Sequence, residues 1–407
     1  MELADVDLVN PDIWIEGVPH EAFRLLRRRA PVFWQEMPGH RGFWAITRYE
    51  DVVTVSKDAA TFSSYRGGTI LKDLPEEDLN NTRTIMLNMD PPQHSKYRKL
   101  VSQGFTPRMT ARLEPRIREA TSAILDEVAE RGECDFVRDV AAELPLIVIA
   151  ELVGVPLEDR HKVFEWSNRL IGFDDPEFGG SENDGKMAAM EMWMYANQLA
   201  EERKKAPRDD LVSVLMTGEV DGEKLSEMEF DSFFLLLAVA GNETTRNLIS
   251  GGMLALIEHP DERRKLIDNP QLVPTGIEEM LRWVSPVSQF RRTATRDTEI
   301  RGQKIREGDK VVVYYQSANR DEDVFPDPYR FDVARSPNNH LAFGIGEHFC
   351  LGANLARLEI RVMFEEILRR LPDIELAGPV RRLRSNFING VKEMPVRFTP
   401  TRKRAAG

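Results

Sequence analysis

The chain has 407 residues, of which 42% are hydrophobic and 30% charged, and these values are typical of an ordinary globular protein. Its formal net charge of −12 argues against a general nucleic-acid-binding protein, because such proteins carry basic surfaces. Two cysteines are too few for a disulfide framework, and the first residues lack a signal-peptide pattern, so we expect a cytoplasmic protein. No apolar run reaches the ~18 residues of a membrane span, so we expect no membrane-spanning helix.

Helical periodicity dominates the chain. It predicts helices over 19–30, 92–104, 107–131, 140–153, 186–205, 208–217, 226–259, 274–284 and 351–370. Strand patterns are fewer and cover 31–47, 310–317 and 387–398. Asn389-Gly390, in the last of them, is typical of a two-residue hairpin turn, and 172–186 has the Gly- and Asp-rich composition of an exposed loop. We therefore predict a mainly α fold with small antiparallel β-sheets, in which residues 1–407 form a single domain.

The first candidate site lies in the predicted helix 92–104. His94 and Arg98 are four residues apart and so share one helix face. Two donors on one face can hold a carboxylate through charge-assisted hydrogen bonds. A solvated polar face is the alternative interpretation of the same spacing.

Polar residues interrupt the apolar helix pattern FLLLAVAGNETTRNLI, residues 234–249. One interpretation is a kink, because a threonine hydroxyl can bond back to a helix carbonyl and loosen the ladder. The other is a groove beside a ligand, in which Glu243 supplies an acid and Thr244 an alcohol. Further along, Glu279 and Arg282 are three residues apart on one helix face, which by itself indicates a surface ion pair.

One of the two cysteines, Cys350, lies between a glycine-rich loop and the predicted helix 351–370. Three interpretations are open: a buried small hydrophobe, a catalytic thiolate with His348 as base, and a metal ligand. The free N–H groups and the dipole of a helix N-terminus stabilise a thiolate there. A lone cysteine without a CxxC partner is a poor tetrahedral zinc site, but it suits an iron whose other ligands come from a macrocycle.

The stretch HLAFGIGEHFCLG, residues 340–352, resembles the haem-binding signature of the cytochrome P-450 monooxygenases. The resemblance implies the fold of that family, a single triangular-prism-like domain. It also implies haem b as cofactor, with Cys350 as the thiolate ligand of the iron, and O2 as co-substrate. Phe343, Gly344 and Gly352 match the signature and are implied to contact the haem.

Further segments resemble this family in its order along the chain. Ala240 to Thr245 is similar to the oxygen-binding element, which implies that Ala240 lies against the haem, that Thr244 hydrogen-bonds the dioxygen and that Glu243 helps deliver protons. This intact acid–alcohol pair argues against the fatty-acid peroxygenase branch. The haem propionates are implied to be bound by His94, Arg98, Arg292 and His340. Glu279 and Arg282 are implied to form a buried structural group with Arg330.

The substrate is inferred from resemblance alone. Several segments look like the bacterial subgroup that hydroxylates terminal methyl groups of steroid side chains and branched lipids. The implied substrate contacts are Val287, Phe290 and Ile388. Close relatives of that subgroup act on terpenoid alcohols such as linalool, and this remains the alternative. A non-catalytic haem sensor or carrier and a thiol-dependent hydrolase are competing classes.

The chain has no appended flavin domain and no cysteine spacing for an iron–sulfur cluster. We therefore expect electrons from a ferredoxin and its NAD(P)H-dependent reductase, and we expect a monomer. A basic run could steer an acidic partner. It comprises Lys96, Arg98, Lys99, Arg108, Arg112, Arg116, Arg118, Arg357 and Arg361.

Overall fold

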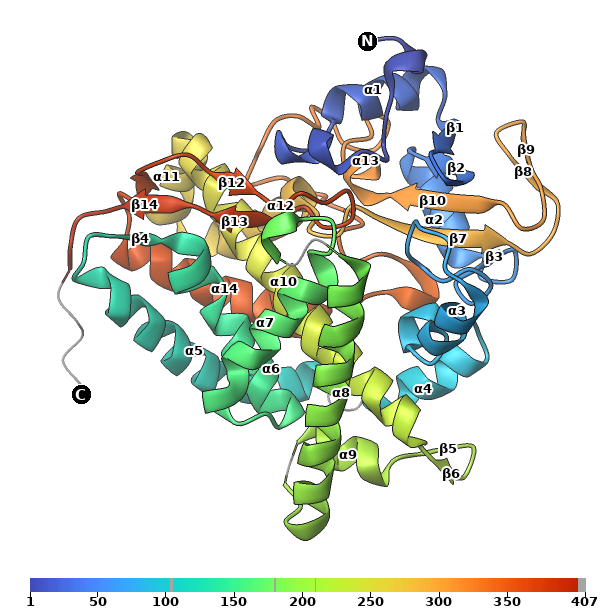
Figure 1. Ribbon diagram of the computed structural model, residues 1–407. Helices are drawn as coiled ribbons and strands as arrows, with labels where there is room; N and C mark the ends of the chain where they lie inside the picture. Colours follow the sequence, from blue (N-terminus) through green and yellow to red (C-terminus); the bar gives the residue numbers. More distant parts are fainter. Residues whose placement is uncertain (103–104, 179–180, 209, 402–407) are drawn as a thin grey trace.

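The computed structural model describes residues 1–102, 105–178, 181–208 and 210–401. Helices form most of the framework (Figure 1). They are α1 (His20–Arg29), α2 (Tyr49–Lys57), α3 (Glu76–Thr82), α4 (Gln93–Ser102), α5 (Pro107–Ala129), α6 (Glu143–Val153), α7 (Arg160–Ile171), α8 (Glu182–Lys205), α9 (Leu211–Thr217), α10 (Glu227–Glu258), α11 (Pro260–Asp268), α12 (Val273–Val284), α13 (Tyr315–Ala318) and α14 (Ala353–Arg370).

The largest sheet has five strands in the order β1-β2-β10-β7-β3. These are β1 (Val32–Met37), β2 (His40–Ile46), β3 (Phe62–Ser63), β7 (Gln289–Ala294) and β10 (Lys310–Tyr314). Its pairs are antiparallel except β2 with β10, which is parallel, with Trp44 opposite Val311. A three-stranded sheet has β14 (Pro395–Arg397) between β11 (Glu375–Leu376) and β4 (Glu133–Asp135). The other sheets are two-stranded. They pair β12 (Arg381–Arg382) with β13 (Val391–Glu393), β5 (Glu219–Val220) with β6 (Glu223–Lys224), and β8 (Thr298–Ile300) with β9 (Gln303–Ile305).

The long helix α10 runs through the centre of the helical part and packs against α6, α7, α8, α12 and α14 (Figure 1). It begins at a capping box, in which the Ser226 hydroxyl accepts from the Glu229 N–H and the Glu229 carboxylate accepts from the Ser226 N–H. Buried side chains cover nearly all its sides after Phe230. A helix that is apolar all round is stable only inside the protein, so α10 is the element on which the others are assembled.

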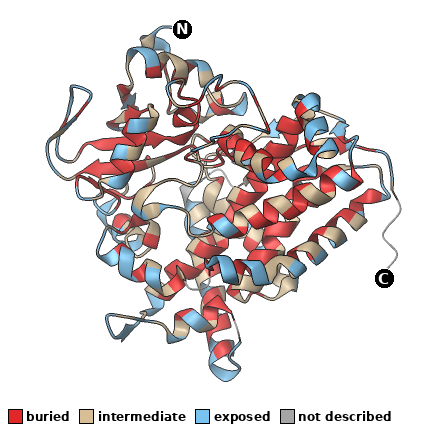
Figure 2. Ribbon diagram, turned by 180° about the vertical axis from the view of Figure 1, so that it is seen from behind, coloured by how far each residue is buried: buried red, intermediate tan, exposed pale blue. Residues whose placement is uncertain are grey.

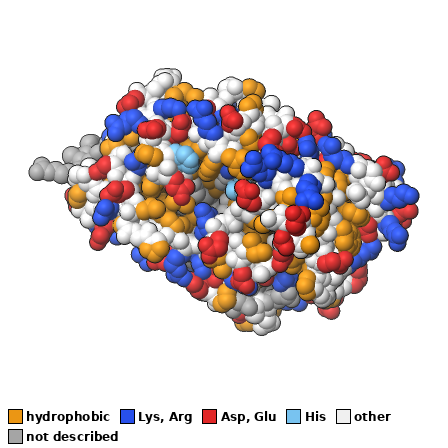
Figure 3. Space-filling view, turned by 90° about the horizontal axis from the view of Figure 1, so that it is seen from above, with side chains coloured by type: hydrophobic (Ala, Val, Ile, Leu, Met, Phe, Trp, Pro, Cys, Tyr) orange, Lys and Arg blue, Asp and Glu red, His pale blue; other side chains and the backbone are white. Residues whose placement is uncertain are grey.

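Burial follows the inner faces of the helices and the central strands (Figure 2). One large hydrophobic core joins α5, α6, α10, α12 and α14, and smaller clusters lie on the two faces of the five-stranded sheet. On the outside, Lys and Arg side chains alternate with Asp and Glu over the face seen in Figure 3, so the acidic net charge is not segregated there. Within the described part of the chain, every helix is too short or too polar to cross a membrane.

Each of the longer predicted helices is present, although residues 103–104 and 209 of the predicted spans lie outside the described residues. Sequence patterning missed α2, α3, α7 and α11. The last follows α10 after one residue, His259, and its Pro260 marks the new start. It also missed β7, where the buried Arg291 and Arg292 conceal a strand pattern.

Three local predictions need correction. The strand predicted over 310–317 ends at Tyr314, and the chain then turns into α13. Asn389-Gly390 is not a two-residue turn, because Asn389 donates from its N–H to the Pro286 carbonyl and from its amide to the Val284 carbonyl. It lies in the longer connection between the antiparallel strands β12 and β13, where the Leu383 N–H donates to the Gly390 carbonyl. The predicted loop 172–186, of which 179–180 lie outside the described residues, is not wholly exposed, since Asp175 is buried.

Candidate active site

The loop before α14 is held in a tight curve. Gly344 and Gly346 have φ values of 68° and 79°, in the left-handed region that glycine adopts without strain. A Cβ on Gly346 would lie 2.6 Å from the Ser56 carbonyl oxygen, so α2 approaches the loop as closely as glycine allows. The Cys350 N–H closes the curve by donating to the Phe343 carbonyl at 2.9 Å. Cys350 is thereby presented at the start of the α14 segment, as the sequence predicted.

The environment of the Cys350 thiol opposes ionisation in part and favours it in part. Burial raises its pKa, whereas the Gly352 N–H and the positive charges of Arg98 and Arg357 lower it. These groups do not cancel the effect of burial, so a thiolate here needs a further positive charge. A thiolate-binding metal ion would supply that charge, so the thiol is compatible with a metal ligand as well as with an inert core cysteine.

Four basic side chains gather beside this loop from α4, β7 and the loop itself: His94, Arg98, Arg292 and His348. The His94 and His348 rings lie 4.2 Å apart between centroids. Burial and the charge of Arg98 lower the pKa of His94 to about 4, and burial with Arg292 lowers that of His348 to about 2. The buried His94 Nδ1 has no hydrogen-bond partner within the described protein. Such a cluster of donors fits a ligand that carries carboxylates.

His340, predicted to belong to this cluster, points elsewhere. Its Nδ1 accepts from the Ala342 N–H at 3.2 Å, so its Nε2 is the donor to the Glu278 carboxylate at 3.0 Å. Arg357 donates to the same carboxylate through two bonds, and together these partners lower the pKa of Glu278 to about 2. His340 therefore pairs with Glu278, and the loop histidine that lies beside His94 is His348; contact of His340 with a propionate stays a prediction.

The polar interruption of α10 does not break the helix, which is continuous from Glu227 to Glu258. Gly241 is required because a Cβ there would lie 2.6 Å from Cδ1 of Ile149 on α6. The Thr244 hydroxyl donates back to the Ala240 carbonyl at 3.0 Å. Ala240 remains exposed and Thr244 partly exposed in mid-helix, so this face of α10 borders accessible space rather than packed side chains.

The next side chain back, Glu243, is directed to Arg246 and is buried, with only 1% of its side chain exposed. One of its oxygens, Oε2, accepts from Arg246 Nη2, and Arg246 Nη1 donates to Asn168 Oδ1 on α7 at 2.8 Å. Burial raises the pKa of Glu243, and Arg246 opposes that effect. Glu243 Oε1 and both amide atoms of Asn242 have no hydrogen-bond partner within the described protein. The acid is held by one cation and is otherwise unsatisfied.

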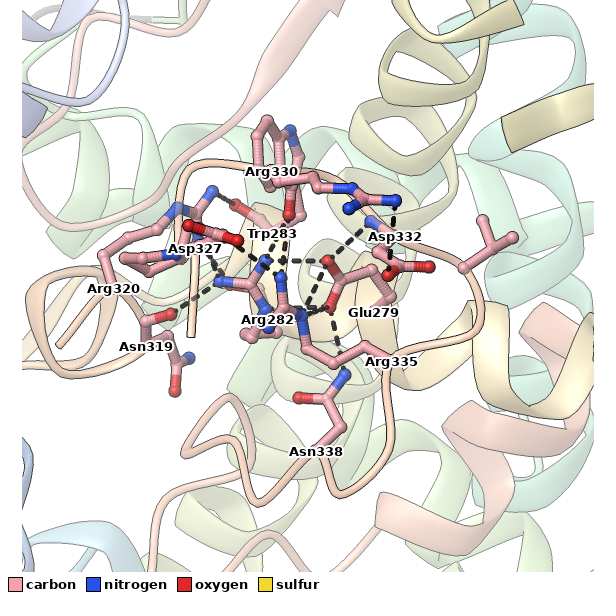
Figure 4. A network of polar contacts seen from close by, with 12 residues as sticks. Glu279, Arg282, Trp283, Asn319, Arg320, Asp327, Arg330, Asp332, Arg335 and Asn338 are labelled. Carbon is pink, nitrogen blue, oxygen red and sulfur yellow. Dashed lines mark hydrogen bonds and ion pairs between the residues drawn. The ribbon is translucent and has the colours of Figure 1, made fainter. Parts of the chain in front are cut away.

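Glu279 and Arg282 form a buried ion pair rather than the surface pair that their spacing alone suggests (Figure 4). Arg282 donates to both carboxylate oxygens and to the carbonyls of Asn319, Pro328 and Arg330. The third member is Arg335, whose guanidinium lies 3.2 Å from the Glu279 carboxylate.

The prediction that the Arg330 side chain is buried with Glu279 and Arg282 was wrong. That side chain is 62% exposed and lies 4.0 Å from Asp332, and only the Arg330 carbonyl joins the network. Asp332 turns the chain between the two arginines, because its carbonyl accepts from the Arg335 N–H at 3.0 Å and its carboxylate accepts from the Ala334 N–H. Arg335, five residues after Arg330, points inward to Glu279.

The predicted substrate residues come from two segments that lie side by side. Val287 and Ile388 form an isolated antiparallel bridge. The Phe290 ring meets the Phe387 ring edge to face, with centroids 5.7 Å apart. Ile388 is 2% exposed, whereas Val287 and Phe290 keep accessible surface. The structure thus brings these residues together, and their contact with a substrate stays a prediction.

Sequence patterning missed three residues of this region: Arg246, Arg335 and His348. His348 was weighed only as a base for the thiol, although its place in the loop signature was a usable signal. Arg246 could have been found from its i, i+3 spacing to Glu243. No local pattern marks Arg335, which acts across 56 residues of chain.

Comparison with known proteins decides between the interpretations of this site. The family model "Cytochrome P450" matches residues 158–372, just over half of the chain. A steroid C26-monooxygenase of Rhodococcus jostii is 46% identical over 96% of this chain and 84% of its own length. The chain belongs to the cytochrome P450 family.

Two further P450s extend the match. A methyl-branched lipid omega-hydroxylase of Mycobacterium bovis is 44% identical over 98% of this chain and 95% of its own length. A Mycobacterium marinum cytochrome P450, solved in complex with pseudoionone, superimposes with a TM-score of 0.91 at 40% identity and covers 97% of this chain and 98% of that one. The protein therefore has the P450 fold and is a P450 monooxygenase with a haem-thiolate iron cofactor and O2 as co-substrate.

The residues present fit a haem. The partly exposed Cys350 thiol lacks a positive charge that iron would provide, and the basic cluster contains His94 Nδ1, which has no hydrogen-bond partner within the described protein and could meet a propionate. A Cβ on Gly352 would meet no atom within 4 Å, so the backbone beside the thiol leaves room for a flat ligand.

Proposed function

We propose that this P450 hydroxylates a terminal methyl group of a steroid side chain or a branched lipid, with Cys350 as the iron ligand. The observation that carries the assignment of the ligand is the Cys350 thiol, which is partly exposed before α14, accepts from the Gly352 N–H and lies in the field of Arg98 and Arg357. When bound, the haem iron supplies the oxygen-activating chemistry, and the thiolate favours O–O cleavage.

The protein side chains bind the cofactor and move protons. His94, Arg98 and Arg292 would hold the propionates, because each can donate to a carboxylate, and His348, whose Nε2 lies 3.2 Å from the Ser64 hydroxyl, lies against His94 beside the cysteine loop. Ala240, Phe343, Gly344 and Gly352 provide the non-polar walls. Thr244 holds its hydroxyl at the accessible face of α10, where it donates to the Ala240 carbonyl and would be able to rotate and donate to a ligand on that side. Glu243 supplies the proton through water, since its carboxyl is the acid of the same helical turn.

The relatives support the substrate class. The two named relatives act on steroids at C26 and on methyl-branched lipids at the omega position, and this chain matches both over nearly its whole length. Val287, Phe290 and Ile388 would line an apolar route, and an apolar wall favours a long hydrocarbon substrate. A terpenoid substrate is the second candidate, because the M. marinum relative was solved with pseudoionone bound.

Cys350→Ala tests the ligand assignment. The reduced wild-type protein should give the red-shifted thiolate band with carbon monoxide, and the variant should lose it. Cys134→Ala is the matched control, because Cys134 is the other cysteine and lies on β4, so its spectrum should remain that of the wild type. A thiolate band in Cys350→Ala would contradict the assignment.

Substrate titration separates the two candidates. Cholestenone and a methyl-branched fatty acid should shift the Soret band and bind at least about tenfold more tightly than linalool, because they bury more apolar area. If linalool binds best and the long lipids give no spectral change, the terpenoid assignment replaces the steroid or lipid one.

We propose that a ferredoxin delivers the electrons and that residues 1–407 act as a single haem domain. Much of the basic run is already paired: Arg118 and Arg361 share Glu114, and Arg357 binds Glu278. Lys99, Arg108 and Arg112 are exposed and form no ion pair with the described residues, so they are the better candidates for steering an acidic partner. Reversing these charges should slow reduction by ferredoxin and weaken its salt dependence, with equilibrium substrate binding unchanged.

A further inference from the structure

The acid of the proton-delivery pair is tied to a neighbouring helix. Glu243 Oε2 accepts from Arg246 Nη2 one turn later on α10. Arg246 in turn donates from Nη1 to Asn168 Oδ1 on α7 at 2.8 Å, and its guanidinium lies 5.3 Å from the centroid of the Phe164 ring, also on α7. The carboxylate is therefore connected to α7 through one arginine.

This contact keeps the acid away from its partner in proton delivery. The Thr244 hydroxyl donates to its own helix, and Glu243 faces Arg246, so neither group points its proton toward the other. The Glu243 side chain is 1% exposed and that of Arg246 6% exposed. Before Glu243 can carry a proton from water toward the Thr244 side of α10, its carboxylate must leave Arg246, and afterwards it returns to the same cation.

The surroundings of the pair contain little else that could hold the acid. Among the described residues, Arg246 is the charged group whose field acts on Glu243, and of the helices packed on α10, α7 contributes Asn168 and Phe164 around Arg246. Arg246 Nε, Glu243 Oε1 and the Asn242 amide have no hydrogen-bond partner within the described protein. A buried pair with open valences can change partners more easily than one whose every atom is bonded.

We propose that Arg246 is the positioning residue for the Glu243 carboxylate, and that Asn168 anchors this ion pair to α7, so that proton delivery depends on how α7 packs against α10. The inference rests on the proposed role of Glu243. In the transfer, the Glu243 carboxylate takes up one proton that a chain of water molecules relays from bulk solvent, and it releases one proton toward the Thr244 side, so the waters end unchanged. The Arg246 charge compensates the carboxylate before and after the exchange.

The test uses the haem-loaded protein and two measurements. Infrared spectroscopy follows the carbonyl band of the protonated Glu243 carboxyl, assigned by its loss in Glu243→Gln. Product formed per NADH is followed as a function of pH. Removing the cation leaves burial unopposed, so in Arg246→Gln the protonated carboxyl should persist to a pH at least about one unit higher than in the wild type. The pH profile of product per NADH should move in the same direction.

Milder variants keep the test decisive if Arg246→Gln does not fold. Arg246→Lys retains the charge but not the forked contacts, and Asn168→Ala removes only the anchor, so each should give a smaller shift of the same sign. Arg203→Lys is the matched control, because Arg203 is equally buried, pairs with Asp210 at 2.6 Å and lies at the end of α8. It should leave both measurements unchanged.

The outcomes separate this inference from the function on which it rests. Unchanged infrared titrations and pH profiles in the Arg246 and Asn168 variants, with product per NADH lost in Glu243→Gln, would overturn the role of Arg246 alone. Full product per NADH in Glu243→Gln would overturn the proton-delivery role and this inference together.

Discussion

Two Glu-x-x-Arg pairs in this P450 have the same spacing, both are buried, and yet their surroundings differ. Around Glu279 and Arg282 nearly every polar atom is bonded: the carboxylate also accepts from the Asp332 N–H, Arg335 and Asn338 (Figure 4). Around Glu243 and Arg246, one carboxylate oxygen and one guanidinium nitrogen have no partner within the described protein. The difference lies in what other segments bring to the pair.

Loops after α13 surround the first pair, and a loop backbone offers carbonyls and N–H groups in any direction. Helices surround the second pair, and the backbone N–H and carbonyl groups inside a helix are already hydrogen-bonded to each other. A completed network is rigid, whereas an incomplete one has a low barrier to rearrangement. The first pair therefore suits a structural role and the second suits proton transfer.

Removing Arg282 should produce the largest loss of stability. Arg282→Ala leaves Glu279 with less compensation and takes the donor away from three backbone carbonyls, so we expect a loss of about 3–5 kcal/mol in the free energy of unfolding. Chemical denaturation and haem retention measure it. A variant that unfolds like the wild type would show that completeness of the network does not stabilise the fold.

Thr244→Ala should instead spare stability and reduce function. The hydroxyl binds only its own helix among the described groups, so stability should change by no more than about 0.5 kcal/mol. Product per NADH should fall about 10- to 100-fold, with the missing electrons recovered as peroxide, because proton delivery is misdirected. Thr245→Ala, one residue along on the same helix, is the control. Wild-type coupling in Thr244→Ala would contradict the catalytic role.

Arg335 and Arg330 provide a matched test of the structural network. Arg335 is 9% exposed and donates to Glu279 and to the carbonyls of Pro326 and Asp327, so Arg335→Ala should lower the free energy of unfolding by about 1–3 kcal/mol. The exposed Arg330 side chain should contribute no more than about 0.5 kcal/mol. Equal losses from the two variants in urea unfolding would restore Arg330 as the third member.

A third buried acid, Asp231 on α10, sharpens the comparison, because its carboxylate accepts from the Asn197 amide rather than from a cation. Burial raises the pKa of Asp231 to about 6, while the Asn197 amide on α8 opposes the effect and Glu227 adds to it. A raised pKa in the folded state means that the protonated form stabilises the fold, and that this contribution is lost as pH rises from about 4 to about 6.

Asp231→Asn should remove this pH dependence. Above pH 6 the variant should be more stable than the wild type by about 1–2 kcal/mol, and the two should converge near pH 4. Thermal unfolding measured from pH 4 to pH 8 tests it. Parallel stability curves for the two proteins would mean that Asp231 titrates as an ordinary carboxyl.

Much of the site could be predicted from local sequence. Gly344, Gly346 and Cys350 lie within one short loop whose curve depends on left-handed φ values. Residue types and spacing within that loop are therefore enough to predict where the thiol lies. His94 and Arg98 share a face because a helix places residues four apart together. Arg292 could not be argued from its own strand, since it is buried beside Arg291 and no pattern says which of them turns to the cysteine loop.

The amino-acid sequence by itself determined the elements and the chemical types: long helices from periodicity, a thiol at a helix start, and an acid beside an alcohol in α10. Both depend on interactions between near neighbours in the chain. Only the tertiary structure decided which of two equally spaced ion pairs is complete, that His348 rather than His340 joins the basic cluster, and that Arg335 rather than Arg330 reaches Glu279. Those outcomes depend on segments 50 or more residues away, and local patterns contain no information on which distant backbone will supply a donor.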